Sequence, residues 1–394
     1  MVEKYIKSNI CVLPWTHLEV DVNGSVSPCC LYKGEIEDYK VYKEGLSNIQ
    51  NSEYMENLRE QFRQGKRPTA CSSCWQEEDA GKTSKRMNSI YKMKNSLTDW
   101  TPQSKPVLKF IDFKLGNVCN LKCRICGSWS SSKWAQEEID YGPNPLARKQ
   151  LSDGQWPKQH PEFFDDIKDI LKDVKYFEFS GGEPFMIERH FRILEYCVEQ
   201  GYAHNQDIHY NTNGTQLPEN KIFWLWSHFK HVEIAFSIDD TDRAFEYQRH
   251  PANWQKVKEN LKEFNTRSTQ SCHNTGNIDF QICSTINIFN ILNLNKLVDW
   301  VKEYNPKYFY INTLFDPEYF NIQTLPNDLK EFVAEKYKNI AELYPIMRFM
   351  NAADRYSDVI NDQRKKRIHQ TDEYRKENFR EIFPELNKFL KIYE

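Results

Sequence analysis

Short apolar segments alternate with longer segments of helical spacing through the middle of the chain. Such alternation is typical of strands that each lead into a helix, which predicts a parallel sheet covered by helices. Six repeats favour an α/β fold of the partial (β/α)6 barrel type. The predicted strands are residues 107–113, 176–179, 207–210, 232–236, 278–285 and 308–312.

A smaller unit is predicted before this sheet, over residues 1–100. Alternating residues around Asn23 and Gly24 indicate a hairpin that places Leu18 opposite Cys29. A helix is predicted next, with one apolar face made of Tyr54, Met55, Leu58 and Phe62. The proline-flanked segment 101–106 is the predicted boundary to the barrel.

The end of the chain differs from the barrel because its pattern is helical and highly charged. The predicted division is a barrel over residues 101–320 and a helical extension over residues 321–394. The extension contains a basic run at residues 364–367, for which a solvated helix face is the favoured interpretation and an acidic partner the alternative.

Composition limits the kind of protein. Of 394 residues, 39% are hydrophobic and 14% aromatic, and the net charge is -3, which is unlike a disordered chain or a general nucleic-acid-binding surface. The apolar stretches are too short to span a membrane and the first residues lack a signal-peptide core. Eleven cysteines in short-spaced groups favour metal binding over disulfides, so the expected location is the cytoplasm.

Cys119, Cys123 and Cys126 form the most informative group, directly after a predicted strand. A 4Fe-4S cluster takes four ligands, so three thiolates without a nearby fourth leave one iron open to a cofactor. Two alternatives are buried free thiols and a zinc site. Structural zinc prefers four protein ligands, so the zinc interpretation requires a distant fourth donor.

Polar or glycine-rich groups follow three later strands, where parallel sheets bind ligands. Around Gly181 and Gly182, backbone carbonyls can approach an amino group, which Glu183 would also attract; an ordinary tight turn is the alternative. Residues 211–214 offer amides and a hydroxyl for a ribose, unless they form a hairpin turn. The candidate binding residues of this second loop and of the next strand are Asn211, Thr212, Asn213, Ser237, Asp239 and Arg249.

The roles in the last group differ. Ser237 is suited to a ribose or a carboxylate, and the planar guanidinium of Arg249 is suited to a carboxylate. Asp239 has an equally good interpretation as a helix cap.

These motifs, in this order, resemble the radical S-adenosylmethionine superfamily over residues 107–315. The resemblance implies a 4Fe-4S cluster on Cys119, Cys123 and Cys126 and S-adenosylmethionine bound by the later loops. It further implies an external electron donor such as flavodoxin or ferredoxin, and a 5'-deoxyadenosyl radical that abstracts a substrate hydrogen. Ile125 departs from the pattern, since many members have an aromatic residue there.

A second group of cysteines lies in the N-terminal unit. Cys11, Cys29, Cys71 and Cys74, with Cys30 as a possible replacement for Cys29, suit either a zinc ribbon or an iron-sulfur cluster. Their spacing is similar to the auxiliary-cluster extensions called SPASM and twitch domains, although these usually follow the barrel. The resemblance implies one auxiliary 4Fe-4S cluster.

Substrate and reaction outcome are less determined. The resemblance implies a C-H bond of a peptide, of the ribosomally made and modified kind, or of a small molecule. Cys283 is a candidate hydrogen-atom donor, although a lone strand cysteine usually belongs to the core. Two other hypotheses are a noncatalytic metal-stabilised binding or electron-transfer protein and an RNA-modifying radical enzyme; the balanced charge makes nucleic acid an unlikely partner.

Overall fold

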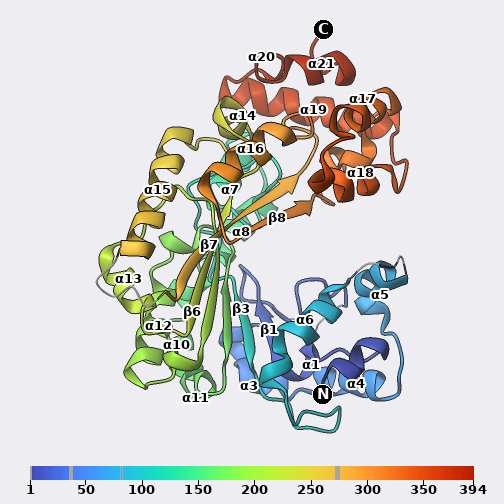
Figure 1. Cartoon of the computed structure of the whole chain (residues 1–394). Coiled ribbons are helices and arrows are strands. Elements are labelled where there is room, and N and C mark those ends of the chain that lie inside the picture. The colour runs from blue at the N-terminus through green and yellow to red at the C-terminus, as the bar shows by residue number, and fades with distance from the viewer. Residues whose placement is uncertain (1, 35–38, 80, 82, 271–275) are drawn as a thin grey trace.

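The computed structural model describes residues 2–34, 39–79, 81, 83–270 and 276–394 (Figure 1). One eight-stranded sheet organises this part of the chain, with strand order β2-β1-β3-β4-β5-β6-β7-β8. All neighbouring strands are parallel except β1 and β2. The strands are β1 His17–Val20, β2 Val26–Ser27, β3 Phe110–Phe113, β4 Tyr176–Phe179, β5 Asp207–Thr212, β6 His231–Ser237, β7 Ile278–Ile286 and β8 Tyr308–Thr313.

The predicted α/β fold with a parallel barrel-type sheet is confirmed. Each of the six predicted strands is present as β3 to β8, and their limits differ from the predicted ones by no more than a few residues. The helices that follow β3 to β7 and cover the sheet are α7 Ser132–Asp140, α8 Pro145–Asp153, α9 Trp156–Gln159, α10 Phe163–Asp166, α11 Lys168–Leu171, α12 Arg189–Glu199, α13 Asn220–Trp226, α14 Asp242–Gln248, α15 Trp254–Gln270 and α16 Leu294–Tyr304.

The N-terminal hairpin is part of this same sheet, because β1 pairs with β3 in parallel. The hairpin itself was predicted, but its predicted register is wrong by one residue: Val20 lies opposite Val26 and Glu19 opposite Ser27. The reason is a longer turn, in which the amide of Asp21 donates to the carbonyl of Ser25 at 2.7 Å. Cys29 therefore lies beyond the paired residues.

Helices of the N-terminal unit surround the hairpin. They are α1 Leu13–Thr16, α2 Val41–Glu44, α3 Leu46–Gln50, α4 Glu53–Arg63, α5 Ser72–Asp79 and α6 Lys85–Met93, with 3-10 turns η1 Val2–Lys7, η2 Thr69–Cys71 and η3 Lys94–Ser96. The predicted apolar face is present on α4, where Met55, Leu58 and Phe62 are buried. Ser52 caps this helix by accepting from the amide of Met55 at 3.3 Å.

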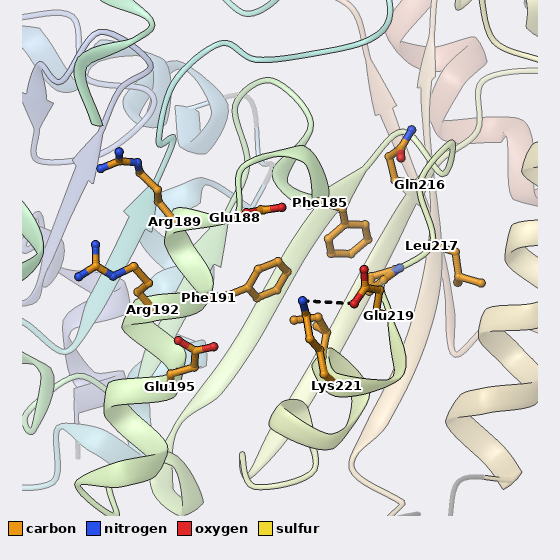
Figure 2. A pocket seen from close by; sticks show the side chains of 12 residues that line it. Phe185, Glu188, Arg189, Phe191, Arg192, Glu195, Gln216, Leu217, Glu219 and Lys221 are labelled. Atoms are coloured by element: carbon orange, nitrogen blue, oxygen red, sulfur yellow. Dashed lines mark ion pairs between the residues drawn. The ribbon is translucent and has the colours of Figure 1, made fainter. Parts of the chain in front are cut away.

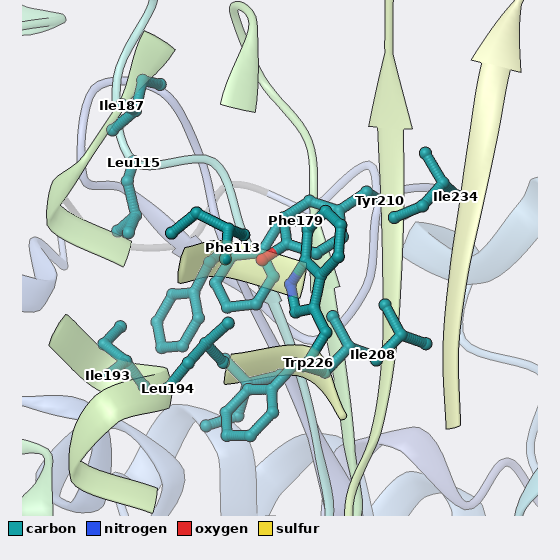
Figure 3. Close-up of a cluster of buried hydrophobic side chains, with 14 of the residues drawn as sticks. Phe113, Leu115, Phe179, Ile187, Ile193, Leu194, Ile208, Tyr210, Trp226 and Ile234 are labelled. Carbon is teal, nitrogen blue, oxygen red and sulfur yellow. The ribbon is translucent and has the colours of Figure 1, made fainter. Parts of the chain in front are cut away.

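One face of the sheet packs against α10 to α13 through aromatic side chains (Figure 3). The rings of Phe113 and Phe179 stack at 6.0 Å between centroids, and those of Phe179 and Tyr210 at 5.2 Å. The indole of Trp226 lies 5.4 Å from the Tyr210 ring. Such ring pairs add to the burial of apolar area, so this side forms the rigid support of the barrel.

The opposite face of the sheet is polar and looks toward the N-terminal and C-terminal units, which both lie on that side in Figure 1. Its side chains alternate with the buried apolar ones along each strand. At the edge strand β8, Tyr308 and Tyr310 are 57% and 54% exposed. One row across neighbouring strands consists of Asp112, Glu178, His209 and Glu233. The sheet thus presents a polar wall between the two terminal units, which is exposed at the edge strand β8 and buried at Asp112 and His209.

The C-terminal extension is helical, as predicted. It contains the 3-10 turns η6 Glu318–Phe320, η7 Ile322–Thr324 and η8 Ala341–Leu343 and the helices α17 Asn327–Tyr337, α18 Tyr344–Asn351, α19 Asp358–Arg375, α20 Phe379–Ile382 and α21 Pro384–Leu390. The basic run on α19 is not wholly solvated. Arg364 is buried and donates to the carbonyls of Tyr319 and Thr324, each at 2.9 Å. Among the helices in the described ranges, none has the length and apolarity needed to cross a membrane.

A buried histidine in the barrel core predicts an acid-dependent loss of stability. Burial lowers the pKa of His190 to about 4, while its Nε2 lies 3.0 Å from the Tyr210 hydroxyl. The folded state keeps this imidazole neutral and the unfolded state protonates it below pH ~6.5, so stability falls as pH falls from about 6.5 to 4. His190→Phe should reduce the slope of unfolding free energy with pH by up to ~1.4 kcal/mol per pH unit.

Urea unfolding of the metal-free protein over this pH range measures the effect. His204→Phe, at an exposed position, is the matched control and should keep the wild-type slope. An unchanged slope in His190→Phe would contradict the assignment.

Candidate functional site

The cysteine loop leaves the carboxyl end of β3 and contains no helix or strand until α7. A turn brings its last two cysteines together, because the amide of Cys126 donates to the carbonyl of Cys123 at 2.9 Å. Burial, followed by the neighbouring Cys123 thiol, raises the pKa of Cys119 to about 12. Burial and the other two thiols likewise raise the pKa of Cys126. The three sulfurs therefore lie close enough to act on one another electrostatically.

A cavity of about 420 Å³ opens beside these sulfurs, within the size range of cofactor sites. It contains all three cysteines and most of the predicted binding residues: Gly181, Gly182, Asn211, Thr212, Asn213, Ser237 and Arg249. The sequence analysis did not single out Leu121, Trp129, Ser130, Ser131, Ser180 and Asp316, which also line it. Ser180 directly follows β4, and this position at a strand end could have identified it as a lining residue. Asp316 follows β8 at the far edge of the sheet, and no sequence signal identified it.

The two glycines bring the loop after β4 against the cysteine loop. A Cβ on Gly182 would lie 2.2 Å from the carbonyl oxygen of Val118, and Gly181 has a φ of +106°. The amide of Glu183 donates to the same Val118 carbonyl at 2.8 Å. Close backbone approach between the two loops is therefore the observed reason for glycine at these positions.

Glu183 lies behind the cavity lining and is 0% exposed. Its carboxylate accepts from the Thr212 hydroxyl and the Asn213 amide, both at 2.7 Å, and from the Phe185 amide at 3.2 Å. Burial raises its pKa to about 7 against these three hydrogen bonds. These hydrogen bonds hold the loop after β5 in place, and the role of Glu183 as the partner of an amino group stays a prediction.

Asp239 is likewise bonded within the protein. It lies 2.7 Å from Nη2 of Arg249 and accepts from the Thr285 amide at 2.8 Å, which fixes the guanidinium at the cavity. Nη1 of Arg249 lies 4.0 Å from the Cys123 sulfur, and Nδ2 of Asn213 lies 3.9 Å from the Cys119 sulfur. Donors beside cluster sulfurs are one of the means by which proteins set a reduction potential.

Four cysteines of the N-terminal unit also converge. Burial is the main cause that raises the pKa of Cys11, and the thiols of Cys71 and Cys74 raise it further. Burial also raises the pKa of Cys29, and the thiol of Cys11 is the next largest cause. Cys30 differs, because it is exposed and the charges acting on it are led by Lys85 and then by the barrel carboxylates. The thiols of Cys11 and of the adjacent Cys30 both raise the pKa of Cys29, and Cys29 is the less exposed of the two neighbouring cysteines.

The residue types of this donor set suit an iron-sulfur cluster. Within the described ranges, no three His, Cys, Asp or Glu side chains are placed to hold one metal ion. A cubane does not need that arrangement, because each thiolate binds a different iron. Three thiols beside a cofactor-sized cavity fit a 4Fe-4S cluster with one open iron.

Another cavity, of about 530 Å³, lies on the outer side of the barrel by α12 and α13 (Figure 2). Lys221 forms an ion pair with Glu219 at 3.2 Å across one side of it, where both side chains are exposed. None of the sequence-predicted site residues is part of its lining. Its chemistry therefore gives no reason to prefer it to the smaller cysteine-lined cavity.

Comparison with known proteins agrees with the site. Residues 113–279 match the family model "Radical SAM superfamily" and residues 11–75 match the SPASM model "Iron-sulfur cluster-binding domain". A radical SAM domain uses S-adenosylmethionine and a 4Fe-4S cluster, and a SPASM domain holds auxiliary iron-sulfur clusters. No curated protein sequence matches the chain.

Similar solved structures are distant. The protein anSMEcpe with bound AdoMet has 19% identity and a TM-score of 0.42, over 67% of this chain and 66% of that chain. Streptococcus suis SuiB bound to the precursor peptide SuiA has 15% identity and a TM-score of 0.36, over 68% of this chain and 59% of that one. The chain thus spans just under two thirds of the first of these relatives. The two matches identify a radical SAM domain over residues 113–279, preceded by a SPASM domain over residues 11–75.

Proposed function

We propose that the protein cleaves S-adenosylmethionine reductively and abstracts a hydrogen atom from a peptide or small-molecule substrate. The observation that carries the proposal is the single cavity that joins Cys119, Cys123 and Cys126 to the loops after β4, β5 and β6. When bound, the cluster and S-adenosylmethionine supply the electron transfer and the 5'-deoxyadenosyl radical. The chain's own residues bind and orient these groups and shield the radical.

Each side chain has a distinct task in this proposal. Cys119, Cys123 and Cys126 hold the cluster, and the backbone at Gly181 and Gly182 receives the amino group. Asn211, Thr212 and Ser237 bind the ribose, and Arg249 binds the carboxylate with its planar fork. Glu183, Asn213 and Asp239 serve by holding these groups, as their hydrogen bonds indicate.

The N-terminal unit supplies one auxiliary 4Fe-4S cluster on Cys11, Cys29, Cys71 and Cys74. The buried grouping of these four thiols supports this assignment. The proposed substrate space is the polar wall of the sheet that faces the two terminal units, where Tyr308 and Tyr310 are exposed. The proposed electron donor is a flavodoxin or a ferredoxin, and the proposed location is the cytoplasm.

Anaerobic reconstitution tests this function. The protein is supplied with iron, sulfide, S-adenosylmethionine and dithionite, and bound iron and released 5'-deoxyadenosine are measured. Two clusters and formation of 5'-deoxyadenosine are expected. Zinc at the barrel loop with intact S-adenosylmethionine would refute the proposal.

Cys283 is proposed to return a hydrogen atom to the substrate. It is half-buried on β7, between Ser237 of β6 and Tyr310 of β8 in the strand register, and Ser237 lines the cavity. Cys283→Ala should leave substrate-free formation of 5'-deoxyadenosine within about twofold of wild type, because the residue does not bind the cofactor. In D2O it should abolish deuterium transfer into the product, since an exchangeable thiol is the source. Unchanged deuterium in the product would remove Cys283 from the mechanism.

A further inference from the structure

The side chains between the three cysteines divide into two sets. Leu121 and Ile125 line the cavity together with the cysteines. Lys122 and Arg124 extend to the other side, and the side chain of Arg124 is only 2% exposed. These two basic side chains contact the region of the C-terminal extension, and Arg124 binds a residue about 250 positions later in the chain.

Arg124 is held by the end of α19. Its Nη2 donates to Oδ1 of Asp372 and to Oε2 of Glu377, each at 2.5 Å. Its guanidinium carbon lies 3.5 Å from the centre of the Tyr247 ring, and its Nε donates to the Tyr247 carbonyl at 3.1 Å. Charge-assisted hydrogen bonds in a buried site have a narrow range of geometry, so they fix the direction of this side chain.

Asp372 collects donors from separate segments. Besides Arg124, Oδ1 accepts from the Tyr247 hydroxyl at 2.7 Å. Oδ2 accepts from the Phe379 amide at 2.7 Å and from the Tyr393 hydroxyl at 2.9 Å. This carboxylate is 1% exposed and links the cysteine loop, α14 and the last helices.

Lys122 has a parallel connection through Glu137 of α7. Glu137 is 1% exposed and forms ion pairs with Lys122 and with Nη2 of Arg375, the latter at 3.0 Å. Arg375 also lies over the Trp134 ring at 4.6 Å, and the Trp134 indole donates to the Cys123 carbonyl at 2.7 Å. Arg375 therefore packs on Trp134, which in turn binds the backbone carbonyl of the cluster cysteine Cys123.

The backbone of the cysteine loop also binds residues near the end of α14. The amide of Lys122 donates to the His250 carbonyl at 2.6 Å, and the amide of Arg124 donates to the Gln248 carbonyl at 2.7 Å. His250 in turn lies 2.7 Å from a carboxylate oxygen of Glu377. Without a helix or strand of its own, the loop owes its conformation to these contacts.

We propose that the end of α19 is a working part of the cluster site, with Asp372, Arg375 and Glu377 as positioning residues that hold the cysteine loop; we name these three the C-terminal clamp. The inference rests on the proposed function, because it takes residues 119–126 as the cluster loop. An irregular loop must lose conformational entropy to present three thiolates at once, and buried ion pairs formed before the cluster arrives reduce that loss. Removing one partner leaves a buried charge unpaired, so the effect should concentrate at the loop.

Asp372→Asn tests the clamp, because it preserves shape and removes the charge that faces Arg124. Glu373→Gln, exposed on the same turn, is the matched control. Two measurements are made: iron release to a chelator, followed by the spectrum of the cluster that responds to S-adenosylmethionine, and hydrogen exchange at residues 122–126 in the metal-free protein. Outer-shell partners of metal ligands are typically worth ~10–100-fold in affinity, so release should be at least ~10-fold faster in Asp372→Asn.

Exchange at the loop amides should also accelerate about tenfold in Asp372→Asn, while Glu373→Gln and the auxiliary-cluster spectrum remain as in the wild type. Equal release and exchange in Asp372→Asn and wild type would overturn the proposal. Joint loss of both clusters in a folded variant would also overturn it, since that outcome marks a general structural role. If Asp372→Asn does not fold, Tyr247→Phe removes one hydroxyl donor and carries the same two outcomes.

The exchange measurement separates this inference from the proposed function. A wild-type cluster that does not respond to S-adenosylmethionine would count against the proposed function. The metal-free exchange rates would still decide whether the C-terminal clamp holds the loop.

Discussion

Cys126→Ala is expected to abolish formation of 5'-deoxyadenosine while the auxiliary cluster remains. With only two protein thiolates, a cubane has two irons without a protein ligand instead of one. Because loss of a mere outer-shell partner costs ~10–100-fold, the decrease here should exceed ~100-fold. Iron content and the product should be measured after anaerobic reconstitution, and bound iron should fall by about half if each site holds one cluster.

Cys30→Ser is the matched control for this variant. Cys30 is exposed and is not one of the four proposed ligands of the auxiliary cluster, so both clusters and product formation should persist. Loss of the auxiliary cluster in Cys30→Ser would exchange the proposed roles of Cys29 and Cys30. Product formation by Cys126→Ala at the wild-type rate would remove Cys126 from the cluster.

Gly182→Ala is expected to disrupt the site without touching a ligand. The new Cβ would lie 2.2 Å from the Val118 oxygen and 2.7 Å from its carbon, and both are backbone atoms that cannot rotate away. The cysteine loop and the loop after β4 must therefore separate. Overpacking of this kind costs ~1–3 kcal/mol, and the upper end is expected because the obstacle is backbone. Cofactor binding, measured by titration with S-adenosylmethionine, should weaken at least tenfold.

Gly201→Ala separates steric conflict from backbone conformation. Gly201 has a φ of +72°, but nothing lies within 4 Å of its Cβ position. Its variant should lose about 1 kcal/mol through the left-handed conformation alone and bind the cofactor normally. Equal effects of the two substitutions in denaturant unfolding and in cofactor titration would contradict the proposed close approach of the two loops.

The barrel was predictable from local pattern. Most of β3 to β8 are short segments in which apolar residues recur at alternate positions, and this pattern is present before any partner strand is known. The cysteine spacing was equally local, since 119, 123 and 126 lie on one loop. The end of each strand also indicated where polar groups would gather, because parallel strands bring their carboxyl ends to one edge.

The role of Glu183 shows where local pattern stops being informative. A glutamate after two glycines predicts a partner for an amino group, which stays a prediction, but nothing in the sequence indicates that its carboxylate also accepts hydrogen bonds from Thr212 and Asn213. Which donors reach a side chain depends on how the loops after β4 and β5 meet. The spacing of residues along the sequence does not predict the distance between these two loops.

The sequence by itself determined the order of strands and helices along the chain. It also determined the three-cysteine loop and the cysteine group of the N-terminal unit. These features depend only on periodicity and on residue type. Only the tertiary structure decided that β1 joins the barrel sheet beside β3, that Arg364 is buried, and that Asp372 meets Arg124. The physical reason is that these contacts join residues far apart in the chain. Their free energy depends on burial and on the geometry of partners, neither of which any single segment contains.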